Sequence, residues 1–397
     1  MELDTFRELL TPAGQAALAL AASFAPTTTT FPACVDRLRK AYSANLAKAA
    51  VETVLLRGKA ASKFPDAARM YFTREALEQA SGHVIAHHRV LRFPGSDSVA
   101  DLCCGIGGDT LALAAGRHVI AVDLDPLHAE MARANAAALG LADRVTVQVG
   151  DACDIPLGNP QAAFADPGRR QGEKRYLSLQ DYLPPPSRLR DRFPDGFPLG
   201  FKLAPGVNRD EVDRWGGEME FLSVDGELKE CVLWCGPLRT TRRRATVLRQ
   251  GQPPATYAAE ELTDPRPPRE PGEYVFDPEA ALVRAELEHD LAERLALHPL
   301  DDGIALFTGD DCPATPFGDW YRIEHSAAFH LGRLRDYLRE QRVGRVTMLK
   351  RASTLDANEV MKKLKLEGSE HRHVILTRSL GQPWVLVVHA VARQDHG

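Results

Sequence analysis

A glycine-rich turn that carries two carboxylates is the first stretch of this sequence whose residue types could do chemistry. Residues 101–109 read Asp-Leu-Cys-Cys-Gly-Ile-Gly-Gly-Asp and continue a short apolar stretch that begins at residue 98. Glycines in such a turn let the backbone take positive φ values and approach a ligand closely. A dinucleotide fingerprint would need a further glycine at position 110, where the sequence has Thr110. The turn therefore predicts a ligand site. It leaves open whether the ligand is a dinucleotide or a cofactor of another class.

Three further polar groups follow later apolar stretches. Asp123 lies 22 residues beyond Asp101, where an acidic residue can receive ribose hydroxyls, and the alternative is a turn aspartate before Pro126. Asp151 follows the next apolar stretch within Gly-Asp-Ala, which suits either a ligand contact or a loop cap. The sequence Asp-Pro-Gly-Arg-Arg occupies residues 166–170, where an ordinary Asp-Pro turn is the alternative.

Short strands that alternate with helices are expected to position these groups. The patterning predicts strands over 98–103, 118–122, 144–149, 162–165 and 199–203, with helices over 109–116 and 126–139. Such alternation produces a parallel, doubly wound sheet that binds its ligands at the carboxyl ends of the strands. Two more strands around Asp225-Gly226 form a hairpin, which brings the sheet to seven strands. The predicted fold class is α/β.

The acidic residue, three residues and Gly-x-Gly-Gly at 101–108 resemble the first motif of class I S-adenosylmethionine (SAM) methyltransferases. The matching residues are 101–109, Asp123, Asp151, 166–170 and 226–230. The resemblance covers about residues 70–235 and implies SAM as the cofactor and the Rossmann-like seven-stranded sheet of that class. More narrowly, the chain resembles a bacterial group in which a THUMP-like domain follows. Residues 72–77 resemble the segment before the core of trimethylguanosine synthase-like enzymes.

This resemblance implies a cofactor site built from the strand ends. Asp101 would face the methionine amino group of SAM, Asp123 the ribose diol, and Asp151 the edge of the adenine. The residues expected to bind the cofactor are Asp101, Cys103, Gly105, Gly107, Asp123, Leu124, Asp151 and Ala152.

The methyl acceptor is expected at residues 166–170. Methyltransferases that act on base amino groups carry Asp or Asn, two prolines and an aromatic residue there, so the first two residues match and the next two depart. A carboxylate and a main-chain carbonyl can hold an amine in line, and an arginine can stack on a base or bind a phosphate. The residues predicted for catalysis are Asp166, Pro167 and Arg169, with Arg170 and Tyr176 binding the substrate and Tyr182 as a second candidate for the stacking ring.

Basic residues gather in two stretches after the predicted sheet. The first contains Arg239, Arg242, Arg243, Arg244 and Arg249. The second, residues 331–378, has 12 Lys and Arg against 6 Asp and Glu. Local clustering of this kind is what phosphate binding requires, and the THUMP-like resemblance implies RNA. We therefore expect residues 242–244 to contact RNA, either tRNA or rRNA, with a plain charged surface as the alternative.

Length and composition agree with several ordinary globular domains. The 397 residues are expected to form a helical domain (1–92), a methyltransferase domain (93–240) and a THUMP-like α+β domain (241–397). The net charge of −5 excludes a uniformly basic polyanion binder. Seven cysteines without framework spacing, and the lack of a secretory or membrane-spanning segment, predict a cytoplasmic protein.

The predicted function is methyl transfer from SAM to RNA at a base nitrogen. Methylation of a small molecule or a protein is the alternative, and a SAM-binding module without turnover would suit the departures at residues 168 and 169. No metal is expected, because His83, His87 and His88 have no acidic or cysteine partner nearby in the sequence.

Overall fold

The computed structural model describes residues 1–169 and 178–392. The chain divides into two compact units. The first contains Met1–Glu218 and Cys231–Thr240, and the second contains Met219–Glu230 and the residues from Thr241 on. In the parts of the chain that are described, no helix combines the length and the apolar character needed to cross a membrane.

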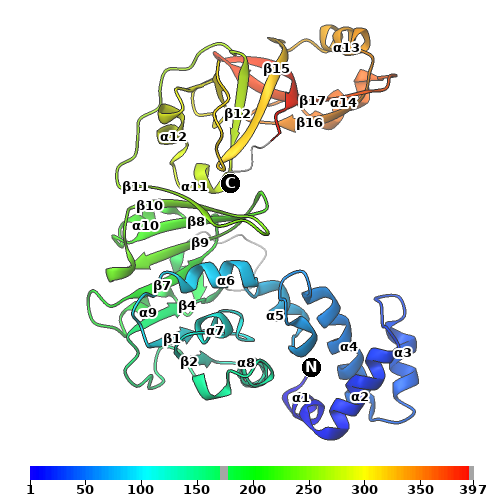
Figure 1. Cartoon of the computed structure of the whole chain (residues 1–397), viewed down its shortest axis with the longest axis vertical. Coiled ribbons are helices and arrows are strands. Elements are labelled where there is room, and N and C mark those ends of the chain that lie inside the picture. The colour runs from blue at the N-terminus through cyan, green and yellow to red at the C-terminus, as the bar shows by residue number, and fades with distance from the viewer. Residues whose placement is uncertain (170–177, 393–397) are drawn as a thin grey trace. The chain divides into compact units, whose positions relative to one another are not determined.

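Six helices form the N-terminal part of the first unit (Figure 1). They are α1 (Leu3–Leu10), α2 (Pro12–Ser23), α3 (Phe31–Leu38), α4 (Ala44–Ala60), α5 (Arg74–Gln79) and α6 (His83–Val90), with a 3-10 turn η1 (Ala67–Arg69) before α5. The hydroxyl groups of Thr11, Ser43 and Thr73 accept a backbone hydrogen bond from the first turn of α2, α4 and α5. Such caps satisfy N–H groups that have no partner inside the helix.

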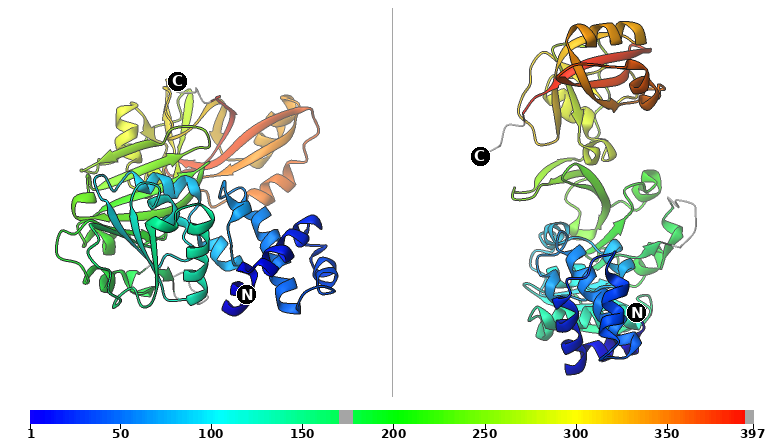
Figure 2. Two further views of the ribbon diagram at one scale, coloured as in Figure 1. Left: turned by 60° about the horizontal axis from the view of Figure 1, so that its bottom comes forward. Right: turned by 90° about the vertical axis from the view of Figure 1, so that its right-hand side faces the viewer.

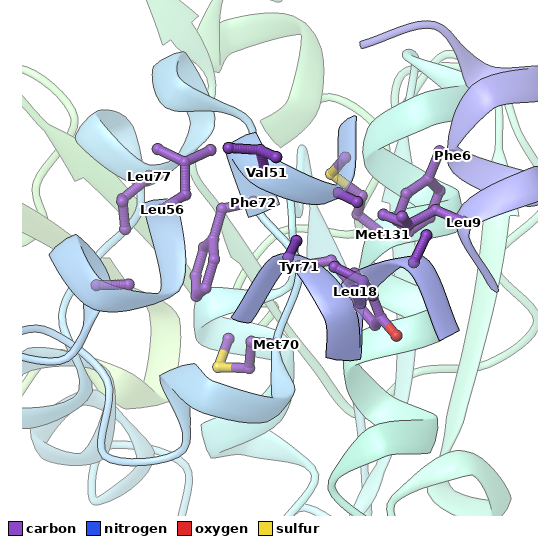
Figure 3. Packing of buried hydrophobic residues seen from close by; sticks show 14 of the residues in the cluster. Phe6, Leu9, Leu18, Val51, Leu56, Met70, Tyr71, Phe72, Leu77 and Met131 are labelled. Atoms are coloured by element: carbon purple, nitrogen blue, oxygen red, sulfur yellow. The ribbon is translucent and has the colours of Figure 1, made fainter. Parts of the chain in front are cut away.

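The N-terminal helices share one hydrophobic core with the α/β part of the first unit. Helix α1 contacts α8 (Pro126–Ala138), and the N-terminal helices lie beside α8 in the left view of Figure 2. Phe6, Val51 and Phe72 are buried in the same cluster as Met131, which belongs to α8 (Figure 3). Burial of apolar side chains therefore holds the helical segment against the helices that cover the sheet.

A nine-stranded sheet has the order β11-β10-β8-β9-β7-β4-β1-β2-β3. Its strands are β1 (Ser98–Leu102), β2 (His118–Asp123), β3 (Val145–Val149), β4 (Ala162–Ala165), β7 (Leu199–Leu203), β8 (Glu218–Val224), β9 (Glu227–Cys235), β10 (Arg243–Leu248) and β11 (Ala255–Ala259). Strands β3, β2, β1, β4 and β7 are parallel, and β9 runs antiparallel to β7. The shorter helical elements in the segments that connect these strands are α7 (Gly108–Leu113), η2 (Ala142–Arg144), η3 (Leu179–Asp181), α9 (Pro186–Arg190), α10 (Arg209–Asp213) and η4 (Gly236–Leu238).

The α/β class is confirmed, and the prediction of seven strands is corrected to nine. Residues 243–248, part of which lie in the predicted basic stretch, and residues 255–259 belong to β10 and β11. Strand β10 pairs in parallel with β8 and antiparallel with β11. Every residue of β10 except Arg244 is buried, and Arg243, Ala245 and Val247 are exposed to 1% or less. The arginines at the start of β10 concealed a strand that is otherwise buried.

The remainder of the second unit contains a separate seven-stranded sheet in the order β13-β14-β12-β15-β18-β17-β16. Its strands are β12 (Tyr274–Pro278), β13 (His298–Pro299), β14 (Phe307–Gly309), β15 (Gly318–Ala328), β16 (Val343–Lys350), β17 (Glu370–Ser379) and β18 (Gln382–Ala390). Its helices are α11 (Ala280–Arg284), α12 (Glu288–Arg294), α13 (Leu331–Glu340) and α14 (Ala357–Leu364). Helices α13 and α14 contact β16 and each other, and their apolar faces share a core with β17 and β18.

Candidate functional site

The carboxyl ends of five parallel strands bring the predicted acidic residues to one edge of the first unit. Asp101 lies near the end of β1, Asp123 ends β2, and Asp151 follows β3. Asp166 follows β4, and Lys202 lies near the end of β7. Because neighbouring strands are parallel and in register, their ends share an edge. The sequence prediction of a strand-end site therefore has the required geometry.

The glycine turn between β1 and α7 takes a left-handed backbone course. The φ angles are +62° at Cys103, +55° at Gly105 and +90° at Gly107. Glycine adopts such angles at little cost, whereas at Cys103 they are strained. A Cβ placed on Gly105 would meet no atom of the described chain within 4 Å, so space lies beside this residue. The turn thus offers backbone that a ligand can approach closely.

Asp123 is held against this turn by backbone hydrogen bonds. Its Oδ2 accepts from the Gly105 N–H at 2.8 Å, and its Oδ1 accepts from the Asp125 N–H at 2.9 Å. Burial raises the pKa of Asp123, while these two backbone N–H groups and His128 lower it. Each carboxylate oxygen has two lone pairs, so Asp123 retains the capacity to accept hydroxyl groups. The neighbouring Leu124 is 72% exposed at the same strand end.

Asp101 is buried to 1% exposure, and its carboxyl group is only half satisfied. Its Oδ2 accepts a hydrogen bond from the Thr110 hydroxyl, while its Oδ1 has no hydrogen-bond partner within the described residues. Burial raises the pKa of Asp101 well above its usual value, and the neighbouring carboxylates Asp109 and Asp166 add to this effect. A buried carboxyl oxygen without a partner is costly, so a ligand group that donates hydrogen bonds would suit this position.

A buried arginine supports the turn from the N-terminal side. Arg89 of α6 is 2% exposed, and its guanidinium forms an ion pair with Asp109 and donates to the Ser81 hydroxyl at 2.9 Å. The same guanidinium lies 4.8 Å from the centroid of the Phe164 ring on β4. Arg89 was not among the residues predicted from the sequence, and Asp109 had no role there beyond the motif, because nothing in their spacing shows that they meet.

The predicted acceptor loop begins with a close ion pair. Asp166 Oδ2 lies 2.6 Å from Lys202 Nζ, and the Lys202 ammonium also donates to the Gln79 carbonyl at 3.3 Å. The backbone N–H of Asp166 donates to the Leu102 carbonyl at 3.0 Å, which fixes the start of the loop beside β1. The structure thus gives Lys202 a carboxylate partner.

The rest of that loop is described only in part. Pro167 follows Asp166, and residues Gly168–Arg169 form the short strand β5, which pairs with β6 (Tyr182–Leu183). The Tyr182 side chain is 3% exposed, and its hydroxyl accepts a hydrogen bond from the Ala204 N–H at 2.7 Å. The prediction that Tyr182 offers a stacking face is therefore wrong, because its ring is buried. Arg170 and Tyr176 lie outside the described residues.

Asp151 and Ala152 lie directly after β3 and are in different environments. Asp151 is exposed, and its Oδ1 accepts from the Cys153 N–H at 2.8 Å. Ala152 is 5% exposed, and its carbonyl accepts a hydrogen bond from the Arg192 guanidinium. This hydrogen bond supports the interpretation of Asp151 as a loop cap.

Of the three arginines predicted to bind RNA, two lie on β10 in the second unit and Arg242 directly precedes that strand. Arg243 is 1% exposed and lies 3.5 Å from Glu286. Arg242 and Arg244 are half-buried. Successive side chains on a strand point to opposite faces, so Arg243 and Arg244 cannot lie on one surface. Arg243 is consequently corrected from a surface contact to a buried residue.

No group of three His, Cys, Asp or Glu side chains that could hold a metal ion occurs within residues 1–169 and 178–392.

Comparisons with known families match three parts of the chain. Residues 99–165 match a family described as a methyltransferase domain, and residues 318–390 match one described as THUMP domain-like. Residues 2–60 match a domain of unknown function (DUF8688).

Relatives from two strains of Mycobacterium tuberculosis match over most of their length. A protein of Mycobacterium tuberculosis strain H37Rv, named as an uncharacterized S-adenosylmethionine-dependent methyltransferase, is 34% identical over 344 residues. The match covers 83% of this chain and 92% of that protein. A shorter match, 40% identical over 83 residues, is to an uncharacterized RNA methyltransferase of Parasynechococcus marenigrum strain WH8102. It covers 20% of this chain and 18% of that protein.

The fold has a match over nearly the whole chain. A crystal structure from Porphyromonas gingivalis W83, described as a methyltransferase, has a TM-score of 0.78 and 20% identity and covers 97% of this chain and 99% of that one. The matched domain and the name of the mycobacterial relative together define a SAM-dependent methyltransferase. With 34% identity to the mycobacterial protein over most of both chains, this chain belongs to that family of S-adenosylmethionine-dependent methyltransferases. Its cofactor is SAM.

Proposed function

We propose that the enzyme transfers the methyl group of SAM to a base nitrogen of RNA. The observation that carries this proposal is the carboxylate of Asp166, fixed by Lys202 at 2.6 Å beside the strand that bears Asp101. A carboxylate in that position can accept a hydrogen bond from an exocyclic amine. The THUMP domain-like match and the short match to an RNA methyltransferase support RNA as the acceptor.

The residues of the first unit fit the cofactor. We assign the unpartnered Oδ1 of Asp101 to the α-ammonium, Asp123 to the ribose diol, and Asp151 with Ala152 to the adenine edge. Cys103, Gly105 and Gly107 supply the left-handed turn, and Leu124 supplies exposed apolar surface near the diol. The bound cofactor contributes an electrophilic methyl group on a sulfonium.

The protein residues act on the acceptor mainly by positioning it. Asp166 accepts from the amine through the carboxylate edge that Lys202 leaves open, and the main-chain carbonyl of Pro167 is the second acceptor. Arg169 is assigned to the base or its phosphate, as are Arg170 and Tyr176, which lie outside the described residues. Arg242 and Arg244 are assigned to phosphates of the RNA other than that of the methylated nucleotide.

Methylation of a small molecule is the second candidate. Short matches over 66 and 103 residues are to a probable tocopherol O-methyltransferase of Oryza sativa and a probable cobalt-precorrin-6B C(15)-methyltransferase of Methanothermobacter thermautotrophicus. These names support a small-molecule acceptor as the alternative. Gly168 and Arg169 replace the second proline and the aromatic residue of the base-methylating pattern, and this departure favours the alternative.

A transfer experiment separates these candidates. The purified enzyme is incubated with SAM that carries a tritiated methyl group and with RNA, protein and small-molecule fractions from cells lacking its gene. We expect label in the RNA fraction, and in Asp166→Ala a rate reduced about 100-fold, the scale expected when a positioning group is removed, with SAM binding retained. Asp195→Ala, which removes an exposed carboxylate of the first unit, is the matched control. Label confined to protein or small molecules would reject the RNA proposal.

A further inference from the structure

The carboxyl group of Asp101 is the most heavily buried titratable group of the cofactor site. Its side chain is 1% exposed, Oδ2 is held by the Thr110 hydroxyl, and Oδ1 has no partner within the described chain. A neutral carboxyl group can occupy such a position at the cost of a missing hydrogen bond. An ionised one would leave a negative oxygen buried away from water without a hydrogen-bond donor in the described chain, which costs far more.

The charged and titratable groups around Asp101 come from four parts of the first unit. They are the carboxylates of Asp109 on α7 and Asp166 after β4, the guanidinium of Arg89 on α6, and the thiols of Cys103 and Cys104 in the turn. Arg89 is already paired with Asp109, and Lys202 is paired with Asp166. No cation of the described chain therefore contacts Asp101 directly, and the net effect of its surroundings is to raise its pKa.

We propose that Asp101 is protonated in the cofactor-free enzyme and releases its proton when a ligand with an α-ammonium binds. The O–H bond of the carboxyl group breaks, the proton passes to the buffer, and the carboxylate that remains forms an ion pair with the ammonium. No electrons are exchanged. This inference rests on the contact between Asp101 and the α-ammonium assigned above, and it does not depend on RNA being the acceptor.

Proton release makes Asp101 a determinant of ligand choice as well as of affinity. A ligand that carries the ammonium supplies the charge that the carboxylate lacks, whereas a ligand without it leaves the neutral carboxyl group unchanged. Because one proton leaves on binding, the affinity for SAM should rise about tenfold per pH unit while the free site is protonated. The affinity for a ligand that lacks the ammonium should not follow pH in this way.

Calorimetry measures the released proton directly. SAM is titrated into the purified full-length enzyme at about pH 6.8, where an α-amino group with a pKa of about 7.7–8.0 is protonated. The titration is made in two buffers that differ widely in ionisation enthalpy, such as PIPES and imidazole. The slope of the observed enthalpy against the ionisation enthalpy gives the number of protons. We expect close to one proton released for SAM and for S-adenosylhomocysteine, and none for 5′-methylthioadenosine, which lacks the amino acid end.

Two variants assign the proton to a residue. Asp101→Asn should bind SAM more weakly and without proton release, while its affinity for 5′-methylthioadenosine stays near that of the wild type. Asp123→Asn, the matched variant at the neighbouring strand end, should weaken all three ligands and keep the proton release for SAM. SAM binding without proton release in the wild type, or equal release with 5′-methylthioadenosine, would overturn the inference. If none of the three ligands binds, the cofactor assignment itself fails, which is a different result from either of these.

Discussion

Asp101 and Asp123 show how two identical side chains at one sheet edge acquire different chemistry. Asp123 accepts two backbone N–H groups, which compensate its burial in part. Asp101 has one hydroxyl donor and one oxygen without a partner among the residues described. Thr110 is that donor, and the sequence presented it only as the residue that breaks a dinucleotide motif. The sequence thus drew attention to Thr110, but it did not show that the Thr110 hydroxyl binds Asp101.

At the residue scale, the raised pKa of Asp101 makes the cofactor-free enzyme less stable as the pH rises. The folded protein keeps a proton that the unfolded chain loses near its usual pKa of about 3.9, so the free energy of unfolding falls with pH between that value and the folded-state pKa. The fall is about 1.4 kcal/mol per pH unit for one proton.

The variant Asp101→Asn removes this pH dependence. Urea unfolding of the cofactor-free wild type and the variant at about pH 5 and about pH 7 should show the variant gaining stability relative to the wild type at the higher pH, by at most about 2.8 kcal/mol over these two units. A difference between the two proteins that is independent of pH would contradict the assigned titration.

At the scale of elements, α8 connects the N-terminal segment to the glycine turn through one side chain. The Asn135 amide accepts from the Tyr71 N–H at 2.7 Å and donates to the Tyr71 carbonyl at 3.1 Å and the Ile106 carbonyl at 2.9 Å. Asn135 is fully buried, so all three bonds are shielded from water. Because Ile106 lies inside the turn, the segment before β1 helps to fix the backbone of the proposed cofactor site.

Replacing Asn135 should therefore loosen both elements. Asn135→Leu keeps a similar volume and leaves three backbone groups without their partner, each worth about 1–3 kcal/mol when buried. We expect urea unfolding to show a loss of at least about 3 kcal/mol, and the SAM affinity of the folded fraction to fall. Ala137→Leu, at an exposed position of the same helix, should stay within about 0.5 kcal/mol of the wild type. Equal stability of the two variants would show that Asn135 does not connect these elements.

At the scale of the whole molecule, the enzyme carries a net charge of −5 and must bind any polyanion through a local surface. Strand β10 shows how sequence clustering can mislead about such a surface. Arg243 is 1% exposed and is paired with Glu286, so it contributes to packing, whereas Arg244 points to the opposite face of the strand and Arg242, directly before the strand, is half-buried. Only the two flanking arginines are therefore candidates for binding phosphate.

This arrangement predicts different effects from neighbouring positions. The double variant Arg242→Glu, Arg244→Glu should bind total tRNA about tenfold more weakly and with a shallower salt dependence, because the slope falls by about one for every phosphate that the protein no longer neutralises. Arg243→Met should leave the salt dependence unchanged and lower the melting temperature, because it leaves the partly buried Glu286 without this guanidinium. Binding and salt dependence that are unchanged in the double variant would remove β10 from the RNA surface.

Much of the first unit was readable from local pattern. The alternation of strands and helices, the glycine turn and the positions of Asp101, Asp123 and Asp166 at strand ends follow from periodicity and turn chemistry, which act over a few residues. The two extra strands were missed because an arginine-rich strand lacks the apolar alternation that identifies one. The domain boundaries at 92 and 240, and the assignment of individual site residues, stay predictions.

The sequence by itself determined the class of enzyme and its cofactor, and it predicted the edge of the sheet where the chemistry is expected. Only the tertiary structure decided which groups meet there. In the structure, Lys202 forms an ion pair with Asp166, and Arg89 forms one with Asp109 at the glycine turn. One oxygen of Asp101 has no partner in the described chain. These ion pairs join residues 20 to 36 positions apart. The physical reason is that hydrogen bonds and burial depend on which segments the fold brings together, and local residue spacing carries no record of that.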